Sequence, residues 1–260
     1  MDEIIYQKIQ EKLDEIEEKE NVEILLCVES GSRAWGFESP DSDYDVRFIY
    51  VRKKDFYLKL EKTRDVIEWQ LDDVFDINGW DIQKTLRLLY KSNPTVFEWN
   101  NSPIIYRVSD KWDSFKSLLN DYFDVKKGLY HYFSTAKSDY RKHLSGDKVK
   151  LKKYFYVLRT LLACEWILDK GTPPPMLFSE LCKTELPHEL LPVVNKLLEV
   201  KMKTPEMGKG DKIKILHDYI KAEFEKIEQI INSTETVKDN SWEPLNKAFL
   251  QVIAAEGEKI

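Results

Sequence analysis

The sequence has few of the residues that mark several specialised classes of protein. Its 260 residues include only three cysteines, Cys27, Cys164 and Cys182, and no two of them form a CxxC pair. Three thiols cannot close a disulfide framework, so we expect a reducing compartment and no structural zinc site. Nine glycines and ten prolines exclude collagen-like and Pro/Gly-rich low-complexity chains.

Long hydrophobic runs and an excess of positive charge are also missing. No stretch of about 18 apolar residues occurs, so we expect no membrane span, and the charged first 21 residues do not have the pattern of a signal peptide. These features predict a cytoplasmic protein with no membrane partner. With a formal net charge of −6, the chain as a whole is not a basic nucleic-acid binder.

The average charge conceals a basic middle segment. Residues 111–159 contain twelve Lys/Arg and five Asp/Glu, a net charge of +7 that leaves −13 for the rest of the chain. Solvated helix faces would explain this segment. A surface that binds a polyphosphate or a nucleic acid would explain it equally well.

The chain does contain enough apolar residues, 42 %, for a sizeable core, and their spacing changes along the chain. The pattern predicts a helix over residues 3–19, short strands over 22–30 and 44–52 around a turn-rich loop, and one or two further strands before residue 80. Asp81 has the position of the N-cap of a helix that stops before Pro94. From about residue 110 long helical patterns take over. We therefore predict an α+β protein, with a mixed sheet and flanking helices over residues 1–108 and an all-helical domain over residues 109–260.

One spacing points to chemistry. Gly31 and Ser32 follow the first predicted strand, and ten residues separate them from Asp43 and Asp45 at the start of the second. Side chains two apart on a strand project from the same face, about 6 to 7 Å apart, and two carboxylates this close repel unless a cation such as Mg²⁺ lies between them. Gly31 permits a close backbone approach, and Ser32 offers a hydroxyl and an N–H to a phosphate. Taken alone, Asp43 and Asp45 also fit a solvated turn at a strand edge.

The same stretch resembles the nucleotidyltransferase superfamily of DNA polymerase β, whose pattern is Gly-Ser, a loop of this length and Asp-x-Asp on a strand. Three segments narrow the resemblance, namely SRAWGFESPDSDYDVRFIYV, GWDIQKTLRLLYKSNPTVFEWNNSPIIY and KKYFYVLRTLLACEWIL with three prolines close behind. Together they are similar to a predicted nucleotidyltransferase family of bacteria and phages, the RNA-ligase-associated polymerase-β-like proteins. The segments extend from residue 31 to about residue 175.

The resemblance implies a catalytic nucleotidyltransferase domain over residues 1–108 and a helical nucleotide- or substrate-binding domain over residues 109–260. It implies transfer of a nucleoside monophosphate from an NTP, ATP among them, to an acceptor hydroxyl with release of pyrophosphate. Mg²⁺ is the expected metal, with Mn²⁺ as an alternative. The expected acceptor is an RNA end, as in RNA repair, and an RNA ligase is a further candidate partner. The alternatives are transfer to a protein or a small molecule, and a catalytically silent module that binds RNA or a partner.

The superfamily's site includes a third carboxylate on a later strand. Asp76 has apolar neighbours and precedes a glycine and a helix start, as that layout requires, so we favour it over Asp72. Asp81 is better explained as a helix cap, and Asp73 lies in the same region. The resemblance therefore implies that the catalytic residues and metal ligands are Asp43, Asp45 and Asp76.

Candidate nucleotide contacts come from two places in the chain. Gly31, Ser32 and Arg33 form the first group, although Arg33 could instead pair with Asp41. In the third segment Lys152, Tyr156 and Arg159 share a helix face, where they would hold the triphosphate and stack on the base. The alternative is a solvated stripe with a half-buried tyrosine.

Other residues in these regions are expected to have structural roles or are less favoured as nucleotide contacts. Trp35 and Phe37 are expected to pack the loop, and His131 and His143 share no metal motif. Lys153 is the neighbour that could replace Lys152. A weaker cluster of the same kind consists of Lys137, Tyr140 and Arg141.

Overall fold

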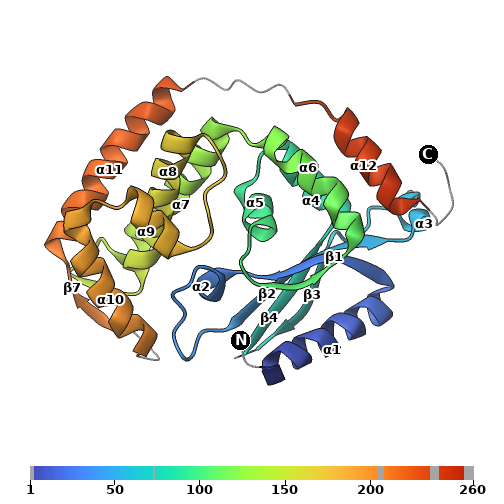
Figure 1. Cartoon of the computed structure of the whole chain (residues 1–260), viewed down its shortest axis with the longest axis horizontal. Coiled ribbons are helices and arrows are strands. Elements are labelled where there is room, and N and C mark those ends of the chain that lie inside the picture. Colours follow the sequence, from blue (N-terminus) through green and yellow to red (C-terminus); the bar gives the residue numbers. More distant parts are fainter. Residues whose placement is uncertain (1–2, 73, 204–207, 235–239, 255–260) are drawn as a thin grey trace.

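A computed structural model describes residues 3–72, 74–203, 208–234 and 240–254 (Figure 1). The N-terminal elements are α1 (Glu3–Glu20), β1 (Val22–Glu29), α2 (Gly31–Ala34), β2 (Tyr44–Arg52), α3 (Lys54–Tyr57), β3 (Val66–Leu71), β4 (Phe75–Asp81), α4 (Ile82–Tyr90), α5 (Pro94–Asn100) and β5 (Ile105–Val108). The α-helices that follow are α6 (Asp113–Leu119), α7 (Val125–His143), α8 (Lys153–Lys170), α9 (Phe178–Glu185), α10 (Leu191–Lys203), α11 (Lys214–Ser233) and α12 (Glu243–Ile253), with a small two-stranded sheet of β6 (Lys148–Lys150) and β7 (Lys209–Asp211). None of the helices in these ranges is long and apolar enough to cross a membrane.

The N-terminal strands form a mixed five-stranded sheet in the order β3-β4-β2-β1-β5. Only the β2–β4 pair is parallel, and in it Asp45 lies opposite Asp76. The prediction of an α+β fold with a mixed sheet is confirmed. The two further strands before residue 80 are β3 and β4, an antiparallel hairpin that places β4 next to β2.

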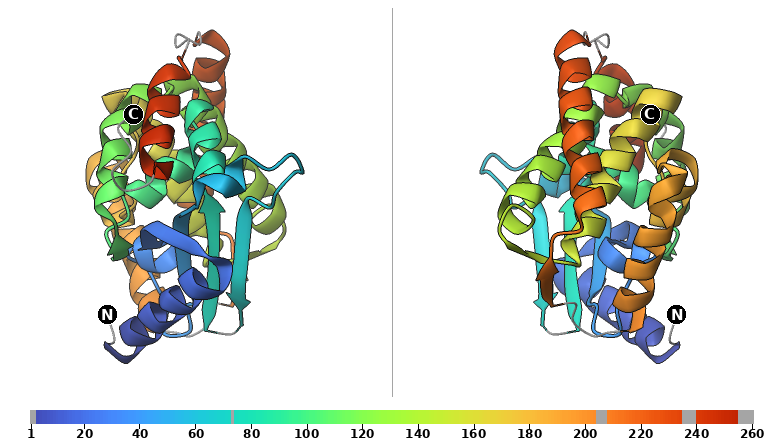
Figure 2. Two further views of the ribbon diagram at one scale, coloured as in Figure 1. Left: turned by 90° about the vertical axis from the view of Figure 1, so that its right-hand side faces the viewer. Right: turned by 90° about the vertical axis from the view of Figure 1, so that its left-hand side faces the viewer.

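The alternating side chains of β2 pack into two separate hydrophobic clusters. Val46, Phe48 and Tyr50 are buried with Ile9 and other residues of α1. Ile49 and Val51 face the opposite way and join the larger cluster that contains the later helices. Figure 2 shows α1 apart from those helices. Because Asp45 and Arg47 share their face with Ile49, they point toward the helical side of the sheet.

The larger cluster runs without a break from the sheet into the C-terminal helices. It joins Leu25 and Ile49 of the sheet to Phe155 of α8 and to Val252 of α12. The last described helix, α12, returns to pack on α4, α6 and β2 (Figure 1). A division into domains at residue 108 stays a prediction, because one core serves both parts.

Two local features differ from the sequence-based expectation. Residues 31–34 form the short helix α2, where we expected an irregular loop, because Gly31 turns the chain at a φ of +59° and its carbonyl accepts the N–H of Trp35. The antiparallel β6–β7 pair joins segments about 60 residues apart. Neither strand alone has enough residues to produce a readable alternation.

A carboxylate pair between α8 and α11 makes stability depend on pH. Lys226 Nζ lies 2.6 Å from Glu165 Oε2 and 3.4 Å from Glu223 Oε2. Burial and the hydrogen bond with Glu165 raise the pKa of Glu223, Lys226 lowers it, and the net result is a pKa of about 7. The folded state therefore favours the protonated carboxyl of Glu223. Its contribution to the free energy of unfolding is fully present below the ordinary pKa of 4.5 and is lost as pH rises through 7.

We expect the free energy of unfolding to fall by about 2 kcal/mol more in the natural protein than in Glu223→Gln between pH 5 and pH 8. Urea unfolding of both proteins at the two pH values measures this difference, and the comparison cancels the titrating groups that do not interact with Glu223. Equal losses in the two proteins would contradict the assignment.

Candidate active site

The ends of three neighbouring elements bring the predicted carboxylates together. β1 leads into α2, and β2 and β4 begin side by side at the same edge of the sheet. Since Asp45 and Asp76 are partners in the parallel register, their side chains leave the sheet on the same face. The residues of the Asp-x-Asp motif and Asp76 therefore lie close together although they are separated by 31 positions in the sequence.

Arg47 lies between the two carboxylates. Its Nη2 atom is 2.9 Å from Asp45 Oδ1 and 2.6 Å from Asp76 Oδ2. Burial raises the pKa of Asp45, Arg47 lowers it, and the charges of Asp76 and Asp43 raise it. The two carboxylates thus already converge on a single cation. The sequence analysis did not identify Arg47, although its position two residues after Asp45 puts it on the same face.

Asp43 precedes β2 and is exposed, and Arg33 holds the backbone beside it. Arg33 Nε donates to the Asp43 carbonyl at 3.1 Å, and its Nη2 donates to the Ser42 carbonyl at 2.6 Å. The guanidinium also lies 3.8 Å from the centre of the Tyr44 ring. Arg33 therefore fixes the backbone of the segment that leads into β2. The alternative ion pair of Arg33 with Asp41 does not occur among the described ion pairs.

The Gly-Ser turn packs directly on Asp45. A Cβ atom on Gly31 would lie 1.9 Å from Asp45 Oδ2, so only glycine leaves room for this carboxylate. The hydroxyl of Ser32 donates to Ser42 Oγ at 3.1 Å and so ties α2 to the segment before Asp43. The close backbone approach expected of Gly31 is present, with Asp45 as the group that approaches it.

A buried glutamate supports the site from behind. Glu29, at the end of β1, is fully buried; its Oε1 accepts the backbone N–H of Asp45 at 2.7 Å, and its Oε2 accepts the hydroxyl of Tyr106. Burial raises the pKa of Glu29 to about 7. The sequence analysis missed this residue, because its only signal is a carboxylate at the end of an apolar strand.

The other candidates for the third carboxylate have local structural roles. Asp72 is exposed and accepts the backbone N–H groups of Val74 and Phe75, each at 2.8 Å, in the β3–β4 turn. Asp81 is the N-cap of α4, as predicted, and accepts the N–H of Gln83 at 2.7 Å and the hydroxyl of Tyr57 at 3.0 Å. Asp73 lies outside the described residues.

The carboxylate oxygens at the site provide some, but not all, of the ligands that a hard divalent cation such as Mg²⁺ needs. Across residues 3–72, 74–203, 208–234 and 240–254, no group of three or more His, Cys, Asp or Glu side chains is arranged to hold a metal ion. Asp45 and Asp76 do supply two convergent carboxylates, the number with which Mg²⁺ is commonly bound alongside waters and substrate phosphates. The site therefore fits a cation that is completed by its substrate.

Helix α8 forms the opposite wall of the site. The edge of the Tyr156 ring meets the Trp35 ring at a centroid distance of 5.4 Å, and Lys153 Nζ lies 3.9 Å from the Tyr156 ring centre. Burial raises the pKa of Tyr156, and the charges of Asp45, Asp139 and Asp43 add to this effect. Tyr156 therefore faces the carboxylates, with half-buried Lys152 one turn away at the N-cap of α8.

A further cation near this wall escaped the sequence analysis. Lys201 of α10 is 4 % exposed and lies 5.3 Å from the centre of the Phe37 ring. Burial lowers its pKa, and the charge of Lys152 lowers it further. Lys201 forms no ion pair with any described residue. Nothing in its local sequence distinguishes it from the other lysines of an amphipathic helix.

Arg159 shares the helix face of Tyr156 but is buried beneath it. Its Nη2 lies 2.8 Å from Glu98 Oε1, and its guanidinium lies 4.4 Å from the centre of the Trp35 ring. These contacts join α8 to α5 and α2. The Arg159 guanidinium, which we expected to bind the triphosphate, is therefore already paired with Glu98. Glu98, which had no role from the sequence, also accepts the hydroxyl of Tyr132 at 2.9 Å.

Most of the remaining predicted residues make packing or inter-helix contacts. Trp35 and Phe37 pack against the larger cluster, as expected. Lys137 pairs with Glu228 at 2.8 Å, and Tyr140 bonds His217 at 3.3 Å, so both belong to the contact between α7 and α11. Arg141 is exposed at the end of α7.

Comparisons with known proteins identify the family of this chain. A family profile described as RNA repair pathway DNA polymerase beta family, RlaP, matches residues 5–251. The chain therefore belongs to the polymerase-β-like RlaP family, which confirms the resemblance noted in the sequence. It is also 42 % identical over 249 residues to the uncharacterized protein YcgL of Bacillus subtilis (strain 168), covering 95 % of this chain and 96 % of that protein. Neither description names an RNA ligase, so that partner stays a prediction.

Proposed function

We propose that this protein is a metal-dependent nucleotidyltransferase that transfers a nucleoside monophosphate from an NTP to the hydroxyl of an RNA end and releases pyrophosphate. The observation that carries the proposal is the convergence of Asp45 and Asp76 on one cation beside the Gly31–Ser32 turn. Membership of a polymerase-β-like family in an RNA repair pathway supports both the reaction class and the acceptor.

Asp45 and Asp76, with Asp43 beside them, would hold Mg²⁺ or Mn²⁺. Bound there, the metal would neutralise the phosphate charge and lower the pKa of the acceptor hydroxyl. Glu29 positions this set by accepting the N–H of Asp45, and Gly31 leaves space for the Asp45 carboxylate.

The nucleotide would lie between α2 and α8. The hydroxyl and N–H of Ser32, with the ammonium groups of Lys152 and Lys201, would bind the β- and γ-phosphates. Lys201 forms no direct ion pair among the described residues, although the charges of Asp41 and Glu38 act on it, so a phosphate would be its first direct anionic partner. Since Lys153 already covers the Tyr156 ring, Tyr156 would contribute its hydroxyl rather than stack on the base. Arg159 positions Trp35 behind Tyr156 and makes no phosphate contact in this proposal.

The proposal is tested by incubating the protein with each α-³²P-labelled NTP, Mg²⁺ or Mn²⁺ and total cellular RNA. We expect label to enter RNA with one or more NTPs and to be lost on chelation by EDTA. Asp45→Asn should lower transfer about 1,000-fold, because metal binding contributes several kcal/mol to such reactions. Transfer by Asp45→Asn at the natural rate would contradict the proposal, and label on the protein itself would replace RNA with a protein acceptor.

One observation favours a catalytically silent RNA-binding module as the second candidate. The Arg47 guanidinium already pairs with both Asp45 and Asp76, and so occupies the position between them. A silent module would bind RNA equally well with and without Mg²⁺ and would not bind NTP. Metal-dependent binding of NTP would exclude it.

A further inference from the structure

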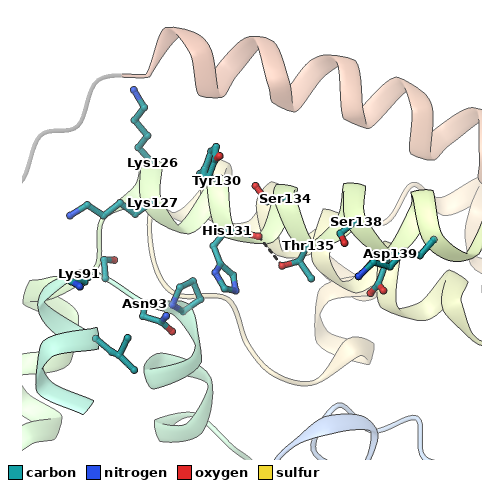
Figure 3. A pocket seen from close by; sticks show the side chains of 14 residues that line it. Lys91, Asn93, Lys126, Lys127, Tyr130, His131, Ser134, Thr135, Ser138 and Asp139 are labelled. Carbon is teal, nitrogen blue, oxygen red and sulfur yellow. Dashed lines mark hydrogen bonds between the residues drawn. The ribbon is translucent and has the colours of Figure 1, made fainter. Parts of the chain in front are cut away.

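A groove of about 780 Å³ runs along α7, on a part of the chain that the proposed chemistry does not use (Figure 3). Its walls come from α7 and from the turn between α4 and α5. Figure 3 shows Lys91 and Asn93 on one side and His131 and Lys127 on the other. The groove therefore joins the sheet-bearing part of the chain to the helical part.

The groove has a strong positive charge. Four lysines line it, and Asp139 is its one acidic lining residue among those described. None of these lysines forms an ion pair with a described residue, whereas Lys137 of the same helix is paired with Glu228. Asp139 in turn has Lys153 and His143 each within 3.8 Å. The four lysines are Lys91, Lys126, Lys127 and Lys142. Unpaired cations lining one concave surface attract a polyanion.

The groove also presents an aromatic ring and hydroxyl groups. Tyr130 is 64 % exposed, and Ser134 and Ser138 follow it at intervals of one helical turn. An exposed tyrosine between lysines is the combination with which proteins bind single strands, because the ring stacks on a base of any sequence. From Lys126 to Lys142 the helix rises about 24 Å, which spans about seven nucleotides of a stacked strand.

One end of the groove lies next to the candidate active site. Asp139 lines the groove, and Lys153 Nζ is 3.8 Å from its carboxylate and 3.9 Å from the centre of the Tyr156 ring. The charges of Asp139 and of Asp45 both act on the Tyr156 hydroxyl. Asp139, Lys153 and Tyr156 thus connect this end of the groove to the carboxylates.

We propose that the α7 groove binds single-stranded RNA, with its lysines on the phosphates and Tyr130 stacked on a base. The strand would run along α7 so that one end reaches the carboxylates beyond Asp139. Delivery of that end rests on the proposed function, but binding of the strand does not.

The test measures binding of a fluorescein-labelled 12-nucleotide single-stranded RNA by anisotropy between 50 and 200 mM salt. In Lys127→Ala/Lys142→Ala we expect at least about tenfold weaker binding and a slope of log K against log salt that is smaller by about 1.4, because two phosphate contacts are lost. Tyr130→Ala should weaken binding about tenfold with an unchanged slope. Lys116→Ala, which removes a lysine paired with Asp113 on α6, should bind like the natural protein.

Natural affinity in both groove variants would overturn the proposal. Displacement of the RNA by excess ATP without metal would also overturn it, since the groove would then be a nucleotide site. Asp45→Asn should bind the strand normally, so a failure of transfer with intact, groove-dependent binding would defeat the proposed function and leave this inference standing. If transfer continues and the groove variants bind RNA normally, the groove inference is wrong and the proposed function still stands.

Discussion

Replacing Asp76 with Asn is expected to lower nucleotidyl transfer about 1,000-fold, whereas Asp72→Asn should change it less than about twofold. Asp76 is the partner of Asp45 in the parallel β2–β4 pair and shares with it the Arg47 guanidinium. Asp72 is exposed and accepts the N–H groups of its own turn, a role that asparagine can also fill. The two variants remove the same charge four residues apart.

Initial rates of transfer of labelled NTP into RNA, at equal concentrations of folded protein, measure both variants. Circular dichroism confirms that each variant keeps its fold. If Asp72→Asn loses activity and Asp76→Asn keeps it, the third carboxylate is Asp72 and the β2–β4 register does not define the site. If both variants transfer at the natural rate, the reaction needs only Asp43 and Asp45.

The second large effect is expected from Gly31→Ala, which should lower transfer more than about 100-fold. The new Cβ would lie 1.9 Å from Asp45 Oδ2, so the carboxylate must move, and a displacement of about 1 Å at a reacting group costs about two orders of magnitude in rate. The positive φ of +59° adds a backbone penalty of about 1 kcal/mol.

Gly171→Ala is the matched control for this substitution. Gly171 has a similar φ of +66° at the end of α8, but nothing lies within 4 Å of the Cβ that it would gain. The backbone conformation should cost both variants about 1 kcal/mol of unfolding free energy. Only Gly31→Ala should also lose activity, because only its new Cβ displaces a carboxylate. Urea unfolding and transfer rates on the same preparations separate the two effects. Full activity in Gly31→Ala would show that the Asp45 carboxylate does not need its observed position.

Local sequence patterns were sufficient for the parts of the site that lie on one element. The period of a strand puts Asp45 and Arg47 of β2 on one face, whereas Asp43, which we expected on the same strand, lies just before it. The N-cap role of Asp81 follows from its own side chain and the helix that starts beside it. In each case the interacting residues are within a few positions of one another, so the backbone geometry of a single element decides the outcome.

Contacts between distant elements could be predicted from the sequence only in part. Asp76 was favoured over Asp72 from the resemblance to a known layout, and the neighbour relation with Asp45 depends on the register of a parallel pair whose strands are 31 positions apart. Arg159 illustrates the opposite case. Its helix face was predicted, but helical periodicity does not tell whether a neighbouring element supplies a partner such as Glu98.

Resemblance of three sequence segments identified the family, and short-range periodicity with a compact motif was enough to predict the mixed α+β class and the Gly-Ser and Asp-x-Asp elements. Three features are visible only in the folded chain: Arg47 lies between two carboxylates, Lys201 is buried without an ion pair among the described residues, and four lysines line one groove. Each of these depends on which helix or strand packs against which. That choice is made by burial of apolar surface over the whole chain, and no local pattern records it.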